Sequence, residues 1–376
     1  MASLKIGFLF PYSGTFPDLK NDFRQGFDLG MSKYAPGLTI SALGEFIQMG
    51  DRKSVEDALN KLLFFEQVDV VLGIVGKLVT MDCIPLVQKN GIPVIINNLG
   101  ESIPSPSFST PSLFYNSLHL WKSQWSMGMW AQAKYGGCPA INLSIYEAGY
   151  QMHECFQMGA AHSGAETVTL NILKNINGPI DTTPLIQYLT EQQPPHAHAL
   201  LSGKESAEFL HLFAESPLRD KVPLSVHPFM TEEPTLDLPS MTTWTKTLDN
   251  PANLLFVEGY VKEYEISPTV YSLLGYEDGL ALGAALASIE GRLTKDKLRA
   301  ALSSVRPEGP RGPISLSTQP LLAAQPVYLC KPMVEQGTGL AGHRVLETVG
   351  ATHWDDPSFA SSWASVSGWQ NPYLCV

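Results

Sequence analysis

The chain has 376 residues, more than a single hydrophobic core usually serves, so two domains are expected. Hydrophobic residues make up 44% of the chain and charged residues 16%, a balance that excludes an intrinsically disordered protein. The net charge is −11 and no segment concentrates lysine and arginine, so neither a nucleic acid nor an anionic membrane surface is expected as a partner.

The first third of the sequence alternates between strand and helix patterns. Residues 4–10 are an apolar run, as in a buried parallel strand. Phe23, Phe27 and Met31 then recur every four residues, which predicts a helix with one apolar face. The series predicts strands at 4–10, 39–48, 68–72 and 93–96 and helices at 18–34, 51–66 and 80–89. Strands and helices in alternation, with short connections, predict a doubly wound parallel sheet.

The pattern stops at residues 102–112, which are rich in serine and proline, and then starts again. The second series predicts strands at 114–116, 140–146, 167–172, 198–201 and 222–226 and helices at 121–135, 151–163, 184–191 and 206–215. The chain therefore contains two α/β units of similar length, with a break near residues 105–120.

The last third has too few elements for a core of its own, and we expect its first part to cover the first lobe. It predicts strands at 254–257 and 314–316, helices at 269–289 and 295–304, and a closing hairpin from 327–329 and 344–349. An aromatic tail follows, with Trp354, Trp363, Trp369 and Tyr373.

The sequence does not decide in which cellular compartment the protein lies. No run of roughly 18 apolar residues could span a bilayer. The chain enters its first strand three residues after Met1, so either the protein is cytoplasmic or a targeting segment is absent from this sequence. None of the five cysteines forms a C-x-x-C pair; Cys330 and Cys375 could pair, but the sequence does not decide this.

Six short motifs in order resemble the type I periplasmic binding proteins, in the branch that binds leucine, isoleucine and valine. They occupy residues 6–14, 26–30, 68–73, 92–95, 274–279 and 309–314. The resemblance implies two Rossmann-like lobes joined by a hinge of three crossovers, with a ligand cleft between them. We expect lobe one at 1–120 and 255–325, and lobe two at 121–254 and 326–376.

The sequence departs from the family pattern at three places. Gln151 follows Tyr150 where the family has glycine, Lys77 stands where small or hydroxyl residues are usual, and the segment beyond about residue 340 is long and aromatic. These departures bear on the ligand more than on the fold.

Ligands of open parallel sheets bind beyond the carboxyl ends of the strands, where loop amides and helix N-termini favour a carboxylate. Lys77 and Glu101, on neighbouring loops, could meet the two ends of a zwitterion, or Lys77 could bind an acidic ligand. Alternatively, the two side chains pair with each other or lie in solvent. The resemblance adds contacts at Ser102, Tyr150 and Tyr276 and near Gly203 and Phe229. The full set of expected ligand-binding residues is Tyr12, Ser13, Gly76, Lys77, Asn98, Glu101, Ser102, Trp121, Gln124, Tyr146, Tyr150, Gly203, Phe229 and Tyr276.

Enzyme signatures are missing from the sequence. The first strand is not followed by G-x-G-x-x-G, and neither H-E-x-x-H nor G-x-S-x-G occurs. His196 and His198 alternate onto one face of a strand, but two histidines alone seldom make a metal site. No cofactor, metal or catalytic residue is expected.

The resemblance implies an extracytoplasmic component of an ABC importer that binds a small polar or zwitterionic metabolite, such as an amino acid or an aromatic acid, by hinge closure. Its expected partners are that solute and a membrane permease, and its expected location is the periplasm. The alternative is a ligand-sensing domain of a signalling system with the same fold, which would be cytoplasmic if it were a regulator; an enzyme is the weakest reading.

Overall fold

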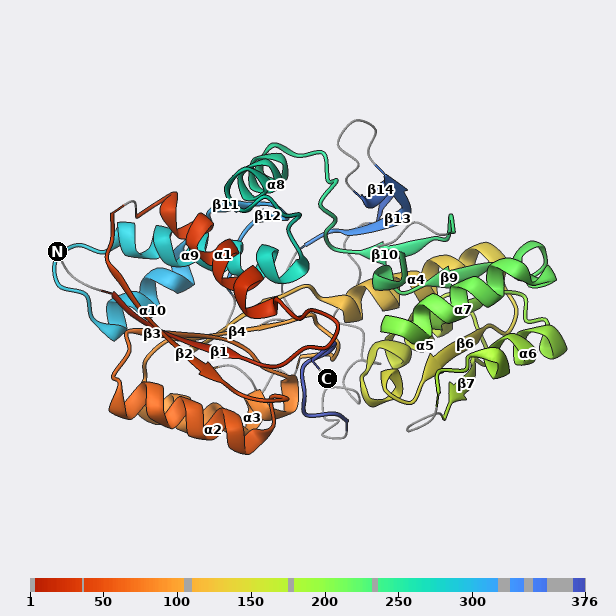
Figure 1. Cartoon of the computed structure of the whole chain (residues 1–376), viewed down its shortest axis with the longest axis horizontal. Coiled ribbons are helices and arrows are strands. Elements are labelled where there is room, and N and C mark those ends of the chain that lie inside the picture. Colours follow the sequence, from red (N-terminus) through yellow and green to blue (C-terminus); the bar gives the residue numbers. More distant parts are fainter. Residues whose placement is uncertain are drawn as a thin grey trace. The chain divides into compact units, whose positions relative to one another are not determined.

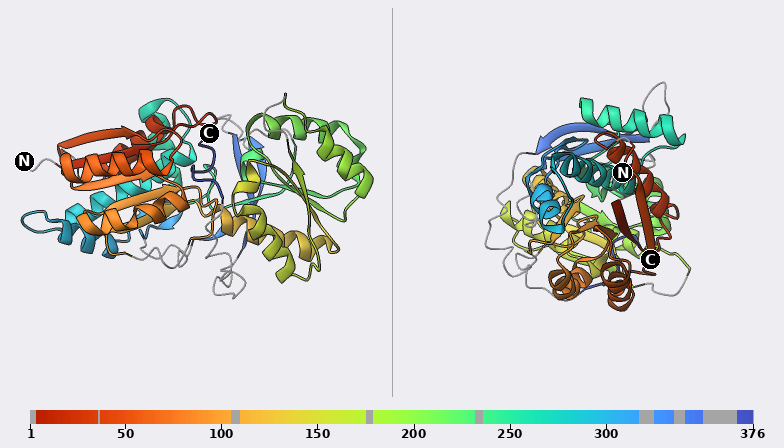
Figure 2. Two further views of the ribbon diagram at one scale, coloured as in Figure 1. Left: turned by 90° about the horizontal axis from the view of Figure 1, so that it is seen from below. Right: turned by 90° about the vertical axis from the view of Figure 1, so that its left-hand side faces the viewer.

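The computed structural model describes residues 4–35, 37–104, 110–174, 179–231, 236–316, 325–334, 341–349 and 368–375. These residues divide into two compact units, shown in Figures 1 and 2. Unit 1 comprises 1–118, 249–325 and 354–376, and unit 2 comprises 119–248 and 326–353. The sequence placed the C-terminal residues on lobe two, whereas the described residues 368–375 pack on unit 1.

Unit 1 is built on a parallel sheet with the strand order β2-β1-β3-β4-β5. The strands are Leu4–Phe10 (β1), Ile40–Phe46 (β2), Val70–Ile74 (β3), Val94–Asn98 (β4) and Leu113–Ser117 (β5). β3 and β5 are buried along their whole length, because helices cover both faces of a parallel sheet. This burial explains why β3 is an apolar run without alternation.

The helices of unit 1 lie in two layers on this sheet. They are Leu19–Ser32 (α1), Arg52–Asn60 (α2, continued by the π-helical turn Lys61–Phe65), Lys77–Asn90 (α3), Pro251–Tyr264 (α8), Val270–Ser288 (α9) and Lys295–Ser304 (α10). α2 and α3 cover one face, and α1, α9 and α10 lie on the other (Figure 1). Apolar residues of α2 and α3, among them Leu59 and Val79, form one core with β3 and β4.

Glycines let pairs of helices pack backbone to backbone in both units. A methyl group on Gly26 of α1 would lie 2.0 Å from the carbonyl oxygen of Ser272 in α9. In unit 2 a methyl group on Gly159 would lie 1.9 Å from the carbonyl oxygen of Trp125. Only a residue without a β-carbon fits at such distances, so these glycines set how closely the helices approach.

Unit 2 repeats the arrangement with a four-stranded parallel sheet in the order β7-β6-β8-β9. Its strands are Ala140–Ser144 (β6), Thr169–Leu173 (β7), Ala197–Leu200 (β8) and Leu224–Val226 (β9). Its helices are Leu120–Tyr135 (α4), Met152–His162 (α5), Thr183–Gln192 (α6) and Gly203–Glu215 (α7), with 3₁₀ turns at Glu147–Gly149, Pro217–Asp220 and Pro228–Thr231. α6 and α7 share a core with β8 and β9, while α5 packs on the sheet through Phe156, which stacks on His198 at 4.4 Å.

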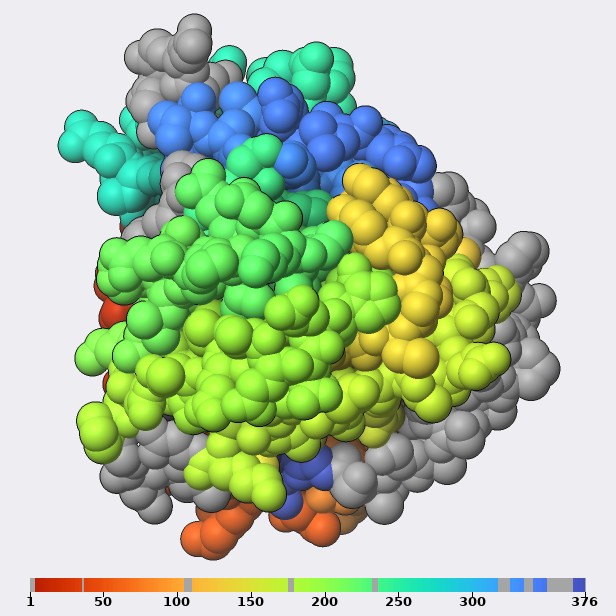
Figure 3. Space-filling view, turned by 90° about the vertical axis from the view of Figure 1, so that its right-hand side faces the viewer, coloured from red at the N-terminus to blue at the C-terminus, as the bar shows by residue number. Residues whose placement is uncertain are grey.

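A second, antiparallel sheet completes unit 2. It has the order β10-β13-β14, with strands Ser240–Thr242 (β10), Val327–Val334 (β13) and Ala341–Val349 (β14). The predicted closing hairpin is thereby confirmed and is longer than expected. Figure 3 shows the two blue strands beside the green and yellow segments of the same unit.

The predicted strand at 254–257 is wrong, because these residues lie inside helix α8. The side chain of Asn250 caps the helix by accepting a hydrogen bond from the backbone N–H of Asn253 at 2.8 Å, and proline stands at the first helical position. Phe256 and Tyr260 are both fully buried, four residues apart, on the inner face. The apolar run is one turn of a half-buried helix, which periodicity over four residues does not distinguish from a strand.

The predicted strand at 314–316 is also wrong, because the strand in the structure begins two residues earlier. The strand is Gly312–Pro313 (β12), which pairs antiparallel with Glu308–Gly309 (β11). Gly312 has a φ of +96°, so the glycine permits the tight turn at the start of β12.

Of the aromatic tail, Trp354 and Trp363 lie outside the described residues. Among the described residues no helix combines the length and apolarity needed to cross a membrane.

Candidate functional site

The predicted lobe-one ligand residues lie mainly at the carboxyl ends of three neighbouring strands of unit 1. Tyr12 and Ser13 follow β1, Gly76 and Lys77 follow β3, and Asn98 ends β4. Since β1, β3 and β4 are adjacent and parallel, their ends meet at one edge of the sheet. The sequence therefore brings these loops together, as expected for an open α/β sheet.

The end of β3 is a positively polarised position. Helix α3 begins at Lys77, and Gly76 is its N-cap residue, with an extended φ of −68° and ψ of 159°. The N–H groups of the first turn carry the positive end of the helix dipole, and the ammonium of Lys77, a residue that is 8% exposed, adds a full charge beside it. This end of the helix is suited to an anionic group.

The loop after β4 is held by its own polar side chains. Asn98 Oδ1 accepts hydrogen bonds from the backbone N–H of Gly100 at 3.0 Å and from the Ser117 hydroxyl at 2.9 Å. Glu101 is only 2% exposed, and burial raises its pKa to about 7, although backbone N–H groups of the loop and of Tyr373 bind the carboxylate. Asn98 and Glu101 thus hold the loop and the chain end in place, while Ser102 lies half-buried beside them.

Next to this loop, a buried guanidinium joins three elements of unit 1. Arg311, in the turn between β11 and β12, binds both carboxylate oxygens of Glu277 in α9; the Nε–Oε1 distance is 2.9 Å. It also donates to the carbonyl oxygen of Ser117 at 2.7 Å and to Asn116 Oδ1 at 2.9 Å, both at the end of β5. Ser117 lies one residue before the last residue of the first segment of unit 1.

The network continues to Asp278, the next residue of α9. Its carboxylate accepts hydrogen bonds from Asn116 at 3.1 Å and from Asn97 at 2.7 Å. Burial raises the pKa of Asp278 to about 8 against the lowering effect of these two donors. Sequence reasoning placed 277–278 and 311 in family motifs and missed this network; the signal for it was a pair of acidic residues inside an otherwise apolar helix.

In unit 2 the predicted ligand residues also follow adjacent strands. Tyr146 and Tyr150 come after β6 and form an aromatic pair, with 3.0 Å between their hydroxyl oxygens and 5.4 Å between their rings. Gly203 follows β8 and is the first residue of α7, with a φ of +54°. Phe229 follows β9, with its ring 5.3 Å from that of His227. Since β6, β8 and β9 are neighbours, unit 2 presents two tyrosines, a helix N-terminus and an aromatic ring along one edge.

Two of the predicted residues lie inside the packing of helices, and a third, Trp121, is buried in the first turn of α4. Gln124 is fully buried in α4, where its Oε1 is 2.7 Å from His198 Nε2, and Trp121 is 1% exposed on the same helix. Tyr276 packs between helices, with its ring 4.5 Å from Phe256 of α8. The aromatic residue of α9 that reaches the strand-end loops is Tyr271, which sequence reasoning missed. We therefore leave Gln124, Trp121 and Tyr276 outside the site proposed below.

The two histidines of β8 belong to the polar core of unit 2. His198 lies 2.9 Å from the Ser225 hydroxyl, and His196 lies 3.1 Å from Gln132 Oε1. Burial holds the pKa of His198 well below its usual value and lowers that of His196 to about 4. No group of three or more potential metal-binding side chains occurs among the described residues. None of the five cysteines, all of which are among the described residues, forms a disulfide, so Cys330 and Cys375 are not paired.

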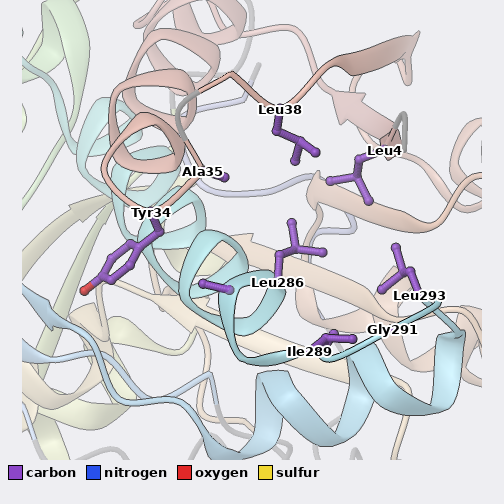
Figure 4. Close-up of a pocket in the computed structure, with 9 residues that line it drawn as sticks. Leu4, Tyr34, Ala35, Leu38, Leu286, Ile289, Gly291 and Leu293 are labelled. Carbon is purple, nitrogen blue, oxygen red and sulfur yellow. The ribbon is translucent and has the colours of Figure 1, made fainter. Parts of the chain in front are cut away.

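A cavity of about 250 Å³ opens at the other end of the unit 1 sheet, beside the first residue of β1 (Figure 4). Leu4, Leu38, Leu286 and Leu293 point into it, and the Tyr34 hydroxyl points away from it. The lining lacks the converging polar groups that fix a polar solute, and no predicted ligand residue contributes to it. We therefore do not assign the solute site to this cavity.

A family model described as "Periplasmic binding protein" matches residues 3–337 of the chain. The chain belongs to this family. Leu/Ile/Val-binding protein homolog 6 of Brucella melitensis is 22% identical to it over 348 residues, which cover 87% of this chain and 86% of the relative. The match spans both units, so the predicted membership of the type I periplasmic binding proteins is confirmed.

Solved structures agree in fold with this periplasmic binding protein. An ABC transporter substrate-binding protein from Sphaerobacter thermophilus has a TM-score of 0.80 and 19% identity, over 93% of this chain and 98% of that one. A solute-binding protein of an ABC transporter from R. palustris, crystallised with benzoate, has a TM-score of 0.73 and 24% identity over the same shares. The predicted two-lobed α/β architecture is therefore confirmed, and this chain has the fold of ABC transporter solute-binding proteins.

Proposed function

We propose that this protein is the extracytoplasmic solute-binding component of an ABC importer and that it binds a small carboxylate metabolite, an amino acid or an aromatic acid. One observation carries the proposal: each unit has its predicted polar and aromatic loops along one edge of its sheet, at the carboxyl ends of adjacent strands. The relatives add support, because one is named for leucine, isoleucine and valine and another was crystallised with benzoate.

The proposed contacts are the strand-end residues Tyr12, Gly76, Lys77, Asn98, Ser102, Tyr146, Tyr150, Gly203 and Phe229. Ser13 and Glu101 are left out of this set because they bind the backbone of residues 373–374. In this proposal the N-terminus of α3 and Lys77 receive the carboxylate, and the tyrosine pair of unit 2 packs on the body of the solute. Binding is coupled to hinge closure, because a solute that binds the closed state better shifts the population toward it.

The protein is proposed to bind its solute without changing it, to lie in the periplasm and to deliver the solute to a membrane permease. The family supports this proposal, since its members compared above are substrate-binding proteins of ABC transporters. Recovering the solute after prolonged incubation tests the first point: NMR spectra are expected to show it unchanged, and a product would assign the protein an enzymatic activity instead.

The binding function predicts a saturable one-to-one complex. Calorimetric and thermal-shift titrations with L-leucine, L-valine, benzoate and 4-hydroxybenzoate are expected to show at least one such complex. A solute at a hundredfold excess over its Kd stabilises the folded protein by roughly 2.7 kcal/mol, which raises the melting temperature measurably. If no compound of a broader panel of small carboxylates raises it, the proposed function is wrong.

Removing the Lys77 ammonium is expected to weaken carboxylate binding at least tenfold. The reason is that Lys77→Ala leaves the N–H groups of α3 in place but removes the full charge next to them. The matched control is Lys89→Ala, which removes the same charge from the last turn of the same helix. A Kd that changes equally in both variants would exclude a direct role for Lys77.

A further inference from the structure

The described end of the chain, residues 368–375, lies across the strand-end loops of unit 1; we call it the C-terminal tail. It contacts the loop after β1 through Ser13, the loop after β2 through Gly50, the start of α3 through Gly76 and the loop after β4 through Glu101. Three of these four contact residues, Ser13, Gly76 and Glu101, were predicted from the sequence to bind the solute.

Polar groups of these loops bind the backbone of the tail. The Ser13 hydroxyl donates to the carbonyl oxygen of Leu374, and the Glu101 carboxylate accepts from the backbone N–H of Tyr373. From α9, the Tyr271 hydroxyl donates to the carbonyl oxygen of Tyr373 at 3.4 Å and lies 3.7 Å from the Cys375 sulfur. Two of the groups that a solute was expected to use, the Ser13 hydroxyl and the Glu101 carboxylate, are therefore engaged by the chain itself.

Two glycines leave room for this close approach. A methyl group on Gly76 would lie 2.5 Å from the carbonyl oxygen of Gln370, and one on Gly50 would lie 2.8 Å from the Pro372 ring. Any larger residue at Gly76 would therefore push the tail away from the N-terminus of α3, although the backbone at Gly76, with its φ of −68°, would accept one. The surface is shaped to hold the tail.

The tail has a buried half and an exposed half. Tyr373, Leu374 and Cys375 are at most 1% exposed, whereas Trp369 is 45% exposed and Gln370 is exposed. A solute that displaced the tail would have to break its hydrogen bonds and return two large apolar side chains to water. The buried half is thus an anchor, and the exposed half is presented beside the start of α3.

We propose that the C-terminal tail is a built-in part of the solute site: it covers the floor formed by Ser13 and Glu101, and its exposed half contacts the solute and helps to select it. This inference rests on the proposed function. It assigns to Trp369 the role that the sequence assigned to the loops beneath the tail, with Lys77 as the charged group. The Gln370 side chain accepts a hydrogen bond from the backbone N–H of Arg52 at 3.5 Å and helps to hold the tail in place.

The test compares binding of benzoate and L-leucine to the full chain and to tail variants. Trp369→Ala changes an exposed side chain, so folding is expected to be kept while affinity for the bound probe falls at least tenfold. Phe65→Ala is the matched control, because Phe65 is 82% exposed in the same unit but precedes the start of β3, at the opposite edge of the sheet. A second variant ends the chain at residue 367 and is expected to lose binding while unit 1 keeps its secondary structure by circular dichroism.

The outcomes separate this inference from the proposed function. If the full chain binds neither probe nor any other small carboxylate, both fail. If the full chain binds and both tail variants bind equally well, the tail is a structural element only and the inference is overturned. Tighter binding after truncation would also overturn it, because the tail would then compete with the solute. If the truncated chain does not fold, the comparison of Kd between Trp369→Ala and Phe65→Ala decides. Equal Kd values for these two variants would overturn the inference.

Discussion

Replacing Arg311 with methionine is expected to destabilise the protein by about 3–5 kcal/mol. The guanidinium is 5% exposed and is the cation for the Glu277 carboxylate, so its loss leaves a buried charge without its partner. The Ser117 carbonyl oxygen and Asn116 Oδ1 lose a donor in the same step. Chemical denaturation followed by circular dichroism measures the change, with the midpoint of the unit 1 transition as the readout.

Two further variants isolate the cause. Adding Glu277→Met to Arg311→Met is expected to recover at least half of the loss, because removing both charges restores an apolar contact of similar volume. Arg52→Met breaks the pair with Glu56 on the surface of α2, where both side chains are largely hydrated, and is expected to cost less than about 1 kcal/mol. A loss of under 1 kcal/mol for Arg311→Met would mean that the pair contributes no more than a surface one.

The position of Arg311 also connects this network with the places where the chain leaves and re-enters unit 1. Ser117, which it binds, lies just before the chain leaves unit 1 at residue 118, and Asn250, where the chain has just re-entered unit 1, donates to the carbonyl oxygen of Pro310 at 3.1 Å. The turn that carries Arg311 therefore fixes the unit 1 ends of two connecting segments.

Most of the parallel-sheet architecture could be predicted, because a strand buried on both faces must be apolar throughout and its helices must carry one apolar face. The patterns at 4–10 and around Phe23, Phe27 and Met31 match β1 and α1 for this reason. The pattern failed at 254–257, where four apolar residues are too few to show a period. In this case the cap at Asn250 and the proline after it were the better signals.

The site could be predicted only in part, since a sequence shows which polar residues exist but not which of them are satisfied by other parts of the chain. Lys77 and Glu101 looked alike as charged residues on strand-end loops. Both are buried in the structure: Lys77 is 8% exposed at the start of a helix, and Glu101 is 2% exposed and holds the backbone of a segment more than 270 residues away. The burial of Gln124 could not be predicted for the same reason. Its side chain contacts His198, which lies on a strand 74 residues away, and no local sequence pattern connects the two residues.

The two units are expected to respond to pH in opposite directions. In unit 1, burial raises the pKa of Glu101 from 4.5 to about 7 and that of Asp278 from 3.8 to about 8. The folded unit therefore binds more protons than the unfolded chain, and its stability falls as pH rises from about 4 to 8. In unit 2, burial lowers the pKa of His196 and His343 from 6.5 to about 4, and that of His227 to about 3. That unit binds fewer protons when folded, so its stability rises with pH until about 6.5.

Hydrogen exchange followed by mass spectrometry measures both trends at once, because peptides report the opening free energy of the unit to which they belong. A pKa difference of one unit between the folded and unfolded states corresponds to about 1.4 kcal/mol of stability. Glu101 alone therefore lowers the stability of unit 1 by about 3 kcal/mol between pH 4.5 and 7. Glu101→Gln is expected to remove that part of the decline and to leave the trend of unit 2 unchanged. Glu290→Gln, at an exposed position of the same unit, is the control and should retain the full decline. A unit 1 stability that rises between pH 5 and 8 would show that the hydrogen bonds to these carboxylates outweigh their burial.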